Sequence, residues 1–175
     1  NILTVGKNAR SAALTLSEIS DQVISEALVL FSSLIQKNKA KILEENDKDV
    51  KLALYNNASK ASIDRLKLDE DRINSLSFVM LNVAKQKSPV DQTIETVIRP
   101  NGLKISKVTT PIGVIGVIFE SRPNVFCDAA ALCLKSKNSS ILKPGSDALK
   151  TVQALYKVLV QALKNKGMPE NCVQI

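Results

Sequence analysis

Two short polar segments, each following an apolar run, carry the residues best suited to chemistry. The segment ESRPN, residues 120–124, ends the run PIGVIGVIF, and the segment KPGSD, residues 143–147, ends the run SSIL. Both combine charged side chains with small or amide-bearing ones, a mixture that suits phosphate and carboxylate groups. Neither segment is a P-loop or a GxGxxG turn, since Gly113 and Gly116 lie inside the first run. The pattern indicates an anion or nucleotide site without the usual glycine turn.

The residue types that are absent or scarce exclude other kinds of site. The sequence has no histidine, which excludes Ser-His and Cys-His dyads and imidazole metal sites. Cys127, Cys133 and Cys172 lack paired metal spacing, so we expect no metal site and a reducing, cytoplasmic location. All three are predicted to be buried small apolar residues, and Asp128 beside Cys127 disfavours a thiolate there.

The composition is that of an ordinary globular domain. Of 175 residues, 45% are apolar and 23% charged, and no stretch has the length of a membrane span or the pattern of a signal peptide. The net charge of +7 indicates either attraction of anionic ligands or a lysine-rich solvated surface. Nucleic-acid binding is not expected, because two tyrosines, four phenylalanines and no tryptophan provide no stacking surface.

The first ninety residues are predicted to be helical. Apolar positions recur with helical spacing from Asp21 to Gln36 and again from Ile42 to Leu54. The second of these helices is expected to end near Asn56 and Asn57, which favour a left-handed stop. A third helix is predicted to begin after Asp69, a good N-cap residue. These apolar residues are interpreted as core packing.

The period changes to two in residues 95–109, ETVIRPNGLKISKVT, around the turn dipeptide Asn101-Gly102. This pattern predicts a β-hairpin with few apolar residues on one face. A thinly covered hairpin that leaves the body of a domain often mediates oligomerisation, so we expect a homo-oligomer that forms through it.

After Pro111 the pattern alternates between strands and helices. We predict a strand over Ile112–Phe119 that is buried on both faces, a helix over Asp128–Ser136, a strand over Ser139–Leu142, a helix that ends near Gly167, and a strand in CVQI. Such alternation is typical of right-handed βαβ units and a parallel sheet, hence of an α/β fold. Because ligands bind at the carboxyl ends of parallel strands, the two polar segments are expected to form one crevice.

Three stretches resemble the amino-terminal part of the γ-glutamyl phosphate reductase family, also called glutamate-5-semialdehyde dehydrogenases, within the aldehyde dehydrogenase superfamily. They are DRLKLDEDRINSL, RPNGLKISKVTTPIGVIGVIFESRPNVFCDAAALCLKSKNSSILKPGSDA and GMPENCVQI. The resemblance spans nearly the whole chain. It implies amino-terminal helices in residues 1–90, a protruding hairpin in 91–110, and an incomplete Rossmann-like parallel βαβαβ sheet in 111–175.

The resemblance also implies a reaction, the NADPH-dependent reduction of L-glutamyl 5-phosphate to L-glutamate 5-semialdehyde and phosphate in proline biosynthesis. In this family a cysteine thiolate attacks the acyl phosphate and a hydride reduces the thioester. That cysteine belongs to a later domain, so the chain is expected to be truncated and inactive alone. Its open sheet edge is expected to cause self-association or marginal stability. The alternative is a non-catalytic domain that binds nucleotide weakly or pairs with a protein partner.

Cofactor-binding residues follow from the same resemblance. Those implied are Ile118, Glu120, Ser121, Lys143, Gly145, Ser146 and Asp147. Where the family typically reads Arg-Gly-Gly-Ser-Glu, this chain has Lys143 to Asp147. Lys143 offers a ribose 2′-phosphate a point charge rather than a bidentate contact, which softens the expected NADPH preference. Pro144 stiffens the loop, and Asp147 has a shorter reach than glutamate. The alternative for Lys143 is a solvated loop lysine.

The resemblance also implies roles for two residues of the segment 121–124. This segment lies where the aldehyde dehydrogenase superfamily has a Pro-Trp-Asn loop. Asn124 is the implied oxyanion donor, and Arg122 the implied contact for the anionic groups of the substrate. The alternative for Arg122 is a structural ion pair with Glu120. Glycines of the family pattern are replaced in this chain, at the positions Asp91, Lys137 and Pro144.

Overall fold

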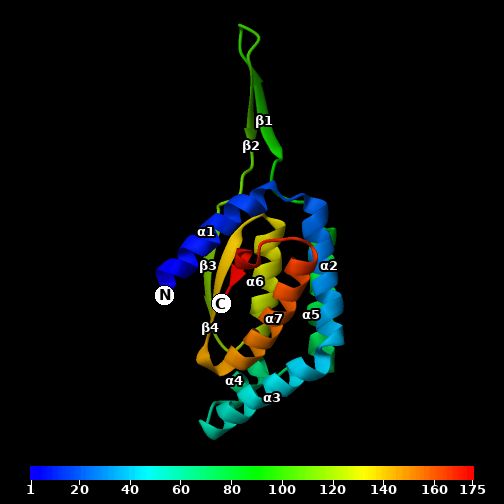
Figure 1. Cartoon of the computed structure of the whole chain (residues 1–175), viewed down its shortest axis with the longest axis vertical. Helices are drawn as coiled ribbons and strands as arrows, with labels where there is room; N and C mark the ends of the chain where they lie inside the picture. Colours follow the sequence, from blue (N-terminus) through cyan, green and yellow to red (C-terminus); the bar gives the residue numbers. More distant parts are fainter.

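A computed structural model describes residues 1–175 and shows a helical body, a central sheet and a projecting hairpin (Figure 1). The helices are α1 (Ile2–Glu18), α2 (Asp21–Lys37), α3 (Lys39–Tyr55), α4 (Lys60–Leu66), α5 (Glu70–Lys85), α6 (Pro123–Lys135) and α7 (Leu149–Asn165), with short 3₁₀ turns η1 (Ser146–Ala148) and η2 (Glu170–Cys172). The strands are β1 (Thr93–Ile98), β2 (Lys104–Val108), β3 (Val114–Phe119), β4 (Ser139–Pro144) and β5 (Val173–Gln174).

Local signals explain where the predicted helices begin and end. The carboxylate of Asp69 accepts a hydrogen bond from the amide of Arg72 at 2.8 Å, which caps α5 as expected. Helix α3 stops just before Asn57, whose φ of 56° confirms the left-handed stop. Helices α1 and α4 were not predicted individually. Gly6 interrupts the pattern of α1, and α4 has only seven residues, too few for a periodic signal.

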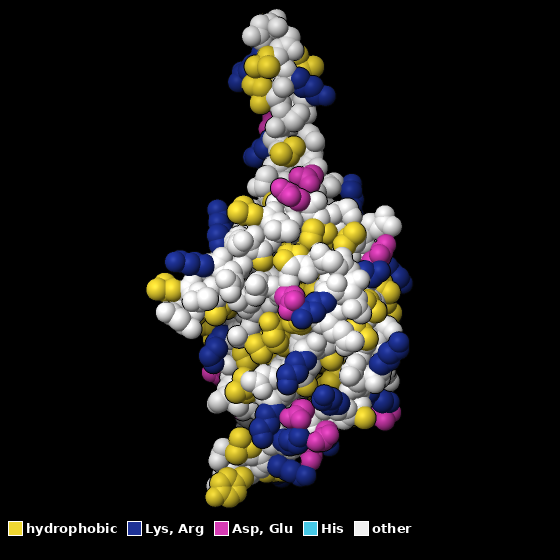
Figure 2. Space-filling model, viewed as in Figure 1, with side chains coloured by type: hydrophobic (Ala, Val, Ile, Leu, Met, Phe, Trp, Pro, Cys, Tyr) yellow, Lys and Arg dark blue, Asp and Glu magenta, His cyan; other side chains and the backbone are white.

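The predicted hairpin is confirmed. Strands β1 and β2 pair antiparallel, and Gly102 with a φ of 84° lies in the turn between them. The hairpin projects from the body, and every residue of its two strands is exposed. Figure 2 shows apolar and basic side chains side by side along it.

The α/β class is confirmed by a parallel three-stranded sheet with the order β3-β4-β5. Helix α6 connects β3 to β4, and α7 connects β4 to β5, as in consecutive βαβ units. Helices α1 and α6 both pack on β4. A single core cluster of 35 buried residues joins these helices to α2, α3 and α5. The amino-terminal helices and the sheet therefore share one core.

The prediction that the first strand is buried on both faces is wrong. Strand β3 lies at the edge of the sheet and pairs only with β4. Ile118 within it is 85% exposed, and Ile112 just before it is 80% exposed. The apolar run gave no information about strand order. Burial of an edge strand depends on neighbours that its own sequence does not contain.

Two predicted boundaries also differ from the structure. Helix α6 begins at Pro123 rather than at Asp128, because proline at the first helical position has the required φ and loses no hydrogen bond there. Asn124 therefore lies in the first turn of α6 and not in a loop. Strand β4 continues to Pro144, because its parallel pairing with β3 extends to the end of both strands. Lys143 consequently belongs to the strand, opposite Ile118.

Two positions where family glycines are replaced have left-handed backbone, Asp91 with a φ of 61° and Lys137 with a φ of 55°. We expect Asp91→Gly to raise the free energy of unfolding by up to about 1 kcal/mol, because glycine adopts this conformation without steric cost. The lost contact matters little, since the Asp91 carboxylate is mostly exposed and lies 3.8 Å from the Lys137 ammonium. Urea denaturation measures the change. The control is Asp91→Ala, which is expected to be less stable than the unsubstituted chain. If Asp91→Gly were also less stable than the unsubstituted chain, the explanation would be wrong.

Candidate functional site

The structure brings the two polar segments together at the carboxyl ends of β3 and β4. The amide of Gly145 donates a hydrogen bond of 2.8 Å to the carbonyl oxygen of Phe119, and the Ser121 hydroxyl donates one to the Asp147 carboxylate. Both bonds join the end of β3 to the loop after β4. The two polar segments therefore meet at adjacent strand ends, and Asp147 is held by Ser121.

Gly145 allows this close approach. A Cβ atom at this position would collide with the Asp147 carboxylate and would lie 3.5 Å from the Cα of Glu120. Any side chain here would therefore displace the Asp147 carboxylate and disturb its hydrogen bond with Ser121. The requirement for glycine at this position is steric. It is not conformational, because the φ of Gly145 is −62°, a value that any residue can adopt.

The remaining side chains implied for the cofactor lie open on this edge of the sheet. Ile118, Glu120, Lys143 and Ser146 are all exposed. The Lys143 ammonium donates a hydrogen bond of 2.8 Å to the Pro144 carbonyl oxygen and forms no ion pair. The apolar side chain of Ile118, the unpaired cation of Lys143 and the small Gly145 suit the adenosine end of a nicotinamide dinucleotide. The exposed Lys143 is equally compatible with a solvated lysine.

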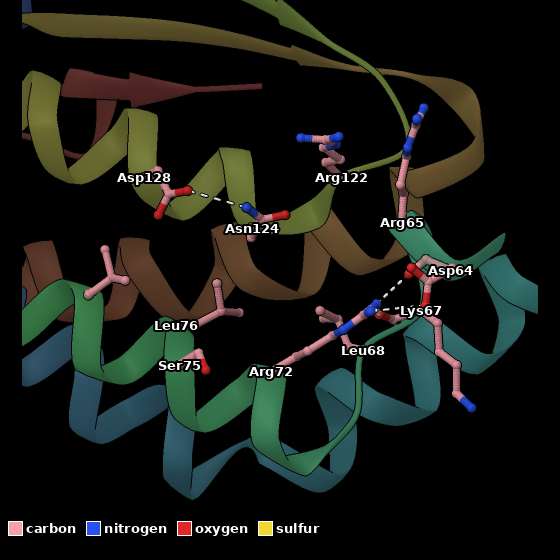
Figure 3. Close-up of a pocket in the computed structure, with 11 residues that line it drawn as sticks. Asp64, Arg65, Lys67, Leu68, Arg72, Ser75, Leu76, Arg122, Asn124 and Asp128 are labelled. Carbon is pink, nitrogen blue, oxygen red and sulfur yellow. Dashed lines mark hydrogen bonds and ion pairs between the residues drawn. The ribbon is translucent and has the colours of Figure 1, made fainter. Parts of the chain in front are cut away.

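A second site lies beside these loops, in a pocket of about 360 Å³ between α5 and the start of α6 (Figure 3). Asn124 and Asp128 project into it from α6, and Arg72, Ser75 and Leu76 from α5. Its charged lining consists of Asp64, Arg65, Lys67, Arg72, Arg122 and Asp128. Four cations against two carboxylates make this pocket suited to a ligand with net negative charge.

One arginine builds the wall of this pocket. The Arg72 guanidinium donates hydrogen bonds to the carbonyl oxygens of Asp64 and Lys67, the second at 2.6 Å, and lies 3.0 Å from the Asp64 carboxylate. It thereby fixes the connection between α4 and α5 and neutralises Asp64. Arg122 has no ion-pair partner, so the alternative of a structural pair with Glu120 is wrong. Its guanidinium remains available to a ligand.

Asp128 is the other carboxylate of the pocket. Its side chain is half-buried and accepts a hydrogen bond of 3.3 Å from the Asn124 amide nitrogen. Burial raises the pKa of Asp128, and the Asn124 hydrogen bond opposes that shift. The Asn124 amide is thus engaged inside the pocket.

The three cysteines are buried and free, as expected. Burial raises the pKa of Cys172 to about 12, and burial together with the charge of Asp128 raises the pKa of Cys127 further. Burial also raises the pKa of Cys133. A reactive thiolate needs access and a depressed pKa, so these residues do not suit a nucleophile.

The sequence interpretation assigned Arg122 and Asn124 to a site but missed Asp64, Arg65, Lys67 and Arg72 as functional candidates. The available signal was the segment DRLKLDEDRINSL, in which the dipeptide Asp-Arg occurs once near the end of α4 and once in the first turn of α5. None of the helices is both long enough and apolar enough to cross a membrane.

No family model matches the chain, but individual proteins do. γ-Glutamyl phosphate reductase of Clostridium perfringens is 41% identical over 174 residues, which cover 99% of this chain and 42% of that enzyme. The enzyme of Bartonella tribocorum is 43% identical over 171 residues, again 42% of its length. The chain thus spans less than half the length of the curated relatives that it matches.

Solved structures give the same result. γ-Glutamyl phosphate reductase of Thermotoga maritima superposes with a TM-score of 0.96 at 34% identity, covering 98% of this chain and 42% of that one. The enzyme of Saccharomyces cerevisiae gives 0.93 at 31% identity, with 98% and 45% covered. A probable aldehyde dehydrogenase of Listeria monocytogenes gives 0.70 at 16% identity and covers 99% of this chain and 35% of that one, which shows likeness of fold alone.

The chain has the α/β fold class that is found in solved aldehyde dehydrogenases. Within that class the chain is a homologue of γ-glutamyl phosphate reductase and corresponds to the amino-terminal portion of that enzyme. The resemblance stated from the sequence is therefore confirmed.

Proposed function

We propose that this chain forms the substrate pocket and part of the cofactor site of an enzyme that reduces L-glutamyl 5-phosphate to L-glutamate 5-semialdehyde and phosphate, a step of proline biosynthesis. The observation that carries the proposal is the cationic pocket directly beside the strand-end loops. A phosphoryl group carries about 1.5 to 2 negative charges, so this substrate has a net negative charge that matches the pocket. The cysteine nucleophile is proposed to lie in the part of the relatives that the match with this chain does not cover.

Arg122 and Asn124 are proposed to act on the substrate. Arg122 precedes α6 at the border between the pocket and the end of β3, and its guanidinium has no partner in the chain. A guanidinium binds phosphate and carboxylate groups through paired hydrogen bonds, so Arg122 holds an anionic group of the substrate. Asn124 is the proposed oxyanion donor. The side-chain amide of Asn124 has two N–H groups. One of them donates a hydrogen bond to Asp128, so the other is the proposed donor to the oxyanion.

NADPH is the proposed cofactor, and it supplies the hydride when bound. Lys143 binds the ribose 2′-phosphate by its charge, and Gly145 leaves room for the cofactor backbone to approach. Ile118, Glu120, Ser121, Ser146 and Asp147 border the same edge. Asp147 has a shorter side chain than glutamate, and its carboxylate already accepts a hydrogen bond from the Ser121 hydroxyl. This contact supports a role for Asp147 in positioning the loop rather than in binding the ribose.

Two further proposals concern assembly and location. The hairpin exposes apolar side chains on both strands, among them Ile94, Ile98, Ile105 and Val108. Exposed apolar surface of this kind marks an interaction site, so the protein is proposed to assemble with copies of itself through the hairpin. Three free cysteines and no disulfide favour a reducing, cytoplasmic location.

Calorimetric titration of the chain with NADPH and NADH tests the cofactor proposal. Lys143→Ala is expected to weaken NADPH binding by about 10-fold to 150-fold, the loss of one charge-assisted hydrogen bond, and to affect NADH less. Lys157→Ala removes the same charge from an exposed position on α7 and is expected to leave both affinities unchanged.

Absence of binding by either cofactor at millimolar concentration would reject the cofactor site in this chain. It would favour the alternative, a non-catalytic domain. Equal weakening of NADPH and NADH by Lys143→Ala would reject the proposed contact with the 2′-phosphate.

A further inference from the structure

The two carboxylates of the pocket differ in their ion-pair partners. Asp64 lies 3.0 Å from the Arg72 guanidinium and is neutralised by it. Asp128 forms no ion pair, although four cationic side chains line the same pocket. Its one hydrogen-bond donor is the neutral amide of Asn124. The pocket therefore contains one half-buried carboxylate without a cation.

A half-buried carboxylate has lost part of its hydration, and a cation that approaches it compensates for that loss. Asp128 faces the pocket from the second turn of α6, and Asn124 lies one turn before it and orients one of its oxygens (Figure 3). The other oxygen retains free acceptor capacity. This arrangement fits an ammonium group that enters with a ligand.

We propose that Asp128 binds the α-ammonium group of the substrate, with Asn124 as the residue that positions its carboxylate. The inference rests on the proposed function, because it assigns one end of an amino-acid substrate to this pocket. Arg65, Lys67 and Arg122 carry the opposite charge on other parts of the lining and serve the anionic groups. The pocket thus selects an amino acid with an anionic side chain over a simple dianion.

Charge alone predicts the opposite preference, which makes the proposal testable. Glutarate has the carbon chain and both carboxylates of L-glutamate but lacks the ammonium group, so it carries one more negative charge. A cationic pocket without a specific ammonium contact would bind glutarate more tightly. A preference for L-glutamate requires a group such as Asp128.

The experiment measures the affinity of the chain for L-glutamate and for glutarate by calorimetry. The unsubstituted chain is expected to prefer L-glutamate, and Asp128→Asn is expected to reduce the ratio of the two affinities by about 10-fold to 150-fold. Asp71→Asn removes a carboxylate from an exposed position on α5 outside the pocket lining and is expected to keep the ratio. Asp128→Glu retains the charge and is expected to keep more of the preference than Asp128→Asn.

The possible failures are distinguishable. If L-glutamate binds and Asp128→Asn keeps the ratio, Asp128 has only a structural role and this inference falls while the proposed function stands. A chain that binds glutarate at least as tightly as L-glutamate also rejects the ammonium contact. If neither ligand binds, the pocket is not an amino-acid site, and the proposed function of the pocket falls as well. If Asp128→Asn does not fold, loss of the preference in Asn124→Ala supports the inference, and retention rejects it.

Discussion

Replacing Asp49 with alanine is expected to lower the free energy of unfolding by about 3–6 kcal/mol, because two short hydrogen bonds to a charged acceptor are lost and each contributes about 1.5–3 kcal/mol. Asp49 lies on α3 and is 2% exposed. Its carboxylate accepts hydrogen bonds from the Thr151 amide at 2.8 Å, from the Thr151 hydroxyl at 2.7 Å and from the Lys150 amide at 3.3 Å. Alanine would leave these donors at the start of α7 without a partner.

The same network extends to the pocket. Asn46 donates hydrogen bonds to the Thr151 hydroxyl at 3.1 Å and to the Leu66 carbonyl at 2.9 Å, and its side-chain oxygen accepts one from the Leu68 amide at 2.7 Å. Leu66 and Leu68 flank Lys67 in the pocket wall. Loss of Asp49 is therefore expected to disturb the connection between α4 and α5 as well as the contact between α3 and α7.

Urea denaturation measures this effect. The matched control is Asp47→Ala on the same helix, where the carboxylate is 57% exposed and pairs with Lys51. That change is expected to alter stability by less than about 1 kcal/mol, since exposed ion pairs contribute little. The hydrogen-bond distances indicate that the buried network stabilises the fold. Equal decreases in the free energy of unfolding for Asp47→Ala and Asp49→Ala would contradict that conclusion.

Reversing the charge of Arg122 is expected to weaken L-glutamate binding by more than about 100-fold. Arg122→Glu removes a guanidinium that is proposed to bind an anionic group of the ligand and places a carboxylate beside that group, a repulsion worth several kcal/mol. Stability should change little, because Arg122 is exposed and its side chain forms no hydrogen bond or ion pair within the chain. Calorimetry and urea denaturation of the same variant separate the two effects.

Arg99→Glu serves as the control for this reversal. Arg99 is exposed in the hairpin, and the variant has the same change in net charge as Arg122→Glu. Its effect on L-glutamate binding is expected to be small, because surface charges farther apart than about 10 Å are screened by salt. Equal weakening in both variants would mean that the net charge of the chain, and not a contact with Arg122, attracts the ligand.

Local chemistry determined much of the fold from the sequence. The periodicity of residues 21–36, the cap at Asp69 and the turn at Asn101-Gly102 act through neighbours a few residues away, and each predicted element is present. The alternation of strands and helices after Pro111 predicted the parallel sheet and the meeting of its two strand-end segments. The resemblance to γ-glutamyl phosphate reductase was likewise visible in the sequence.

Tertiary structure alone decided the properties that depend on distant neighbours. The exposure of Ile118 follows from the place of β3 at the sheet edge, and the burial of Asp49 from a partner 102 residues away. The pocket joins residues 64–79 to residues 122–128 through the packing of α5 on α6. Charge and polarity can be read along a chain, but which charges share a cavity depends on how helices pack, and that packing is fixed by the core as a whole.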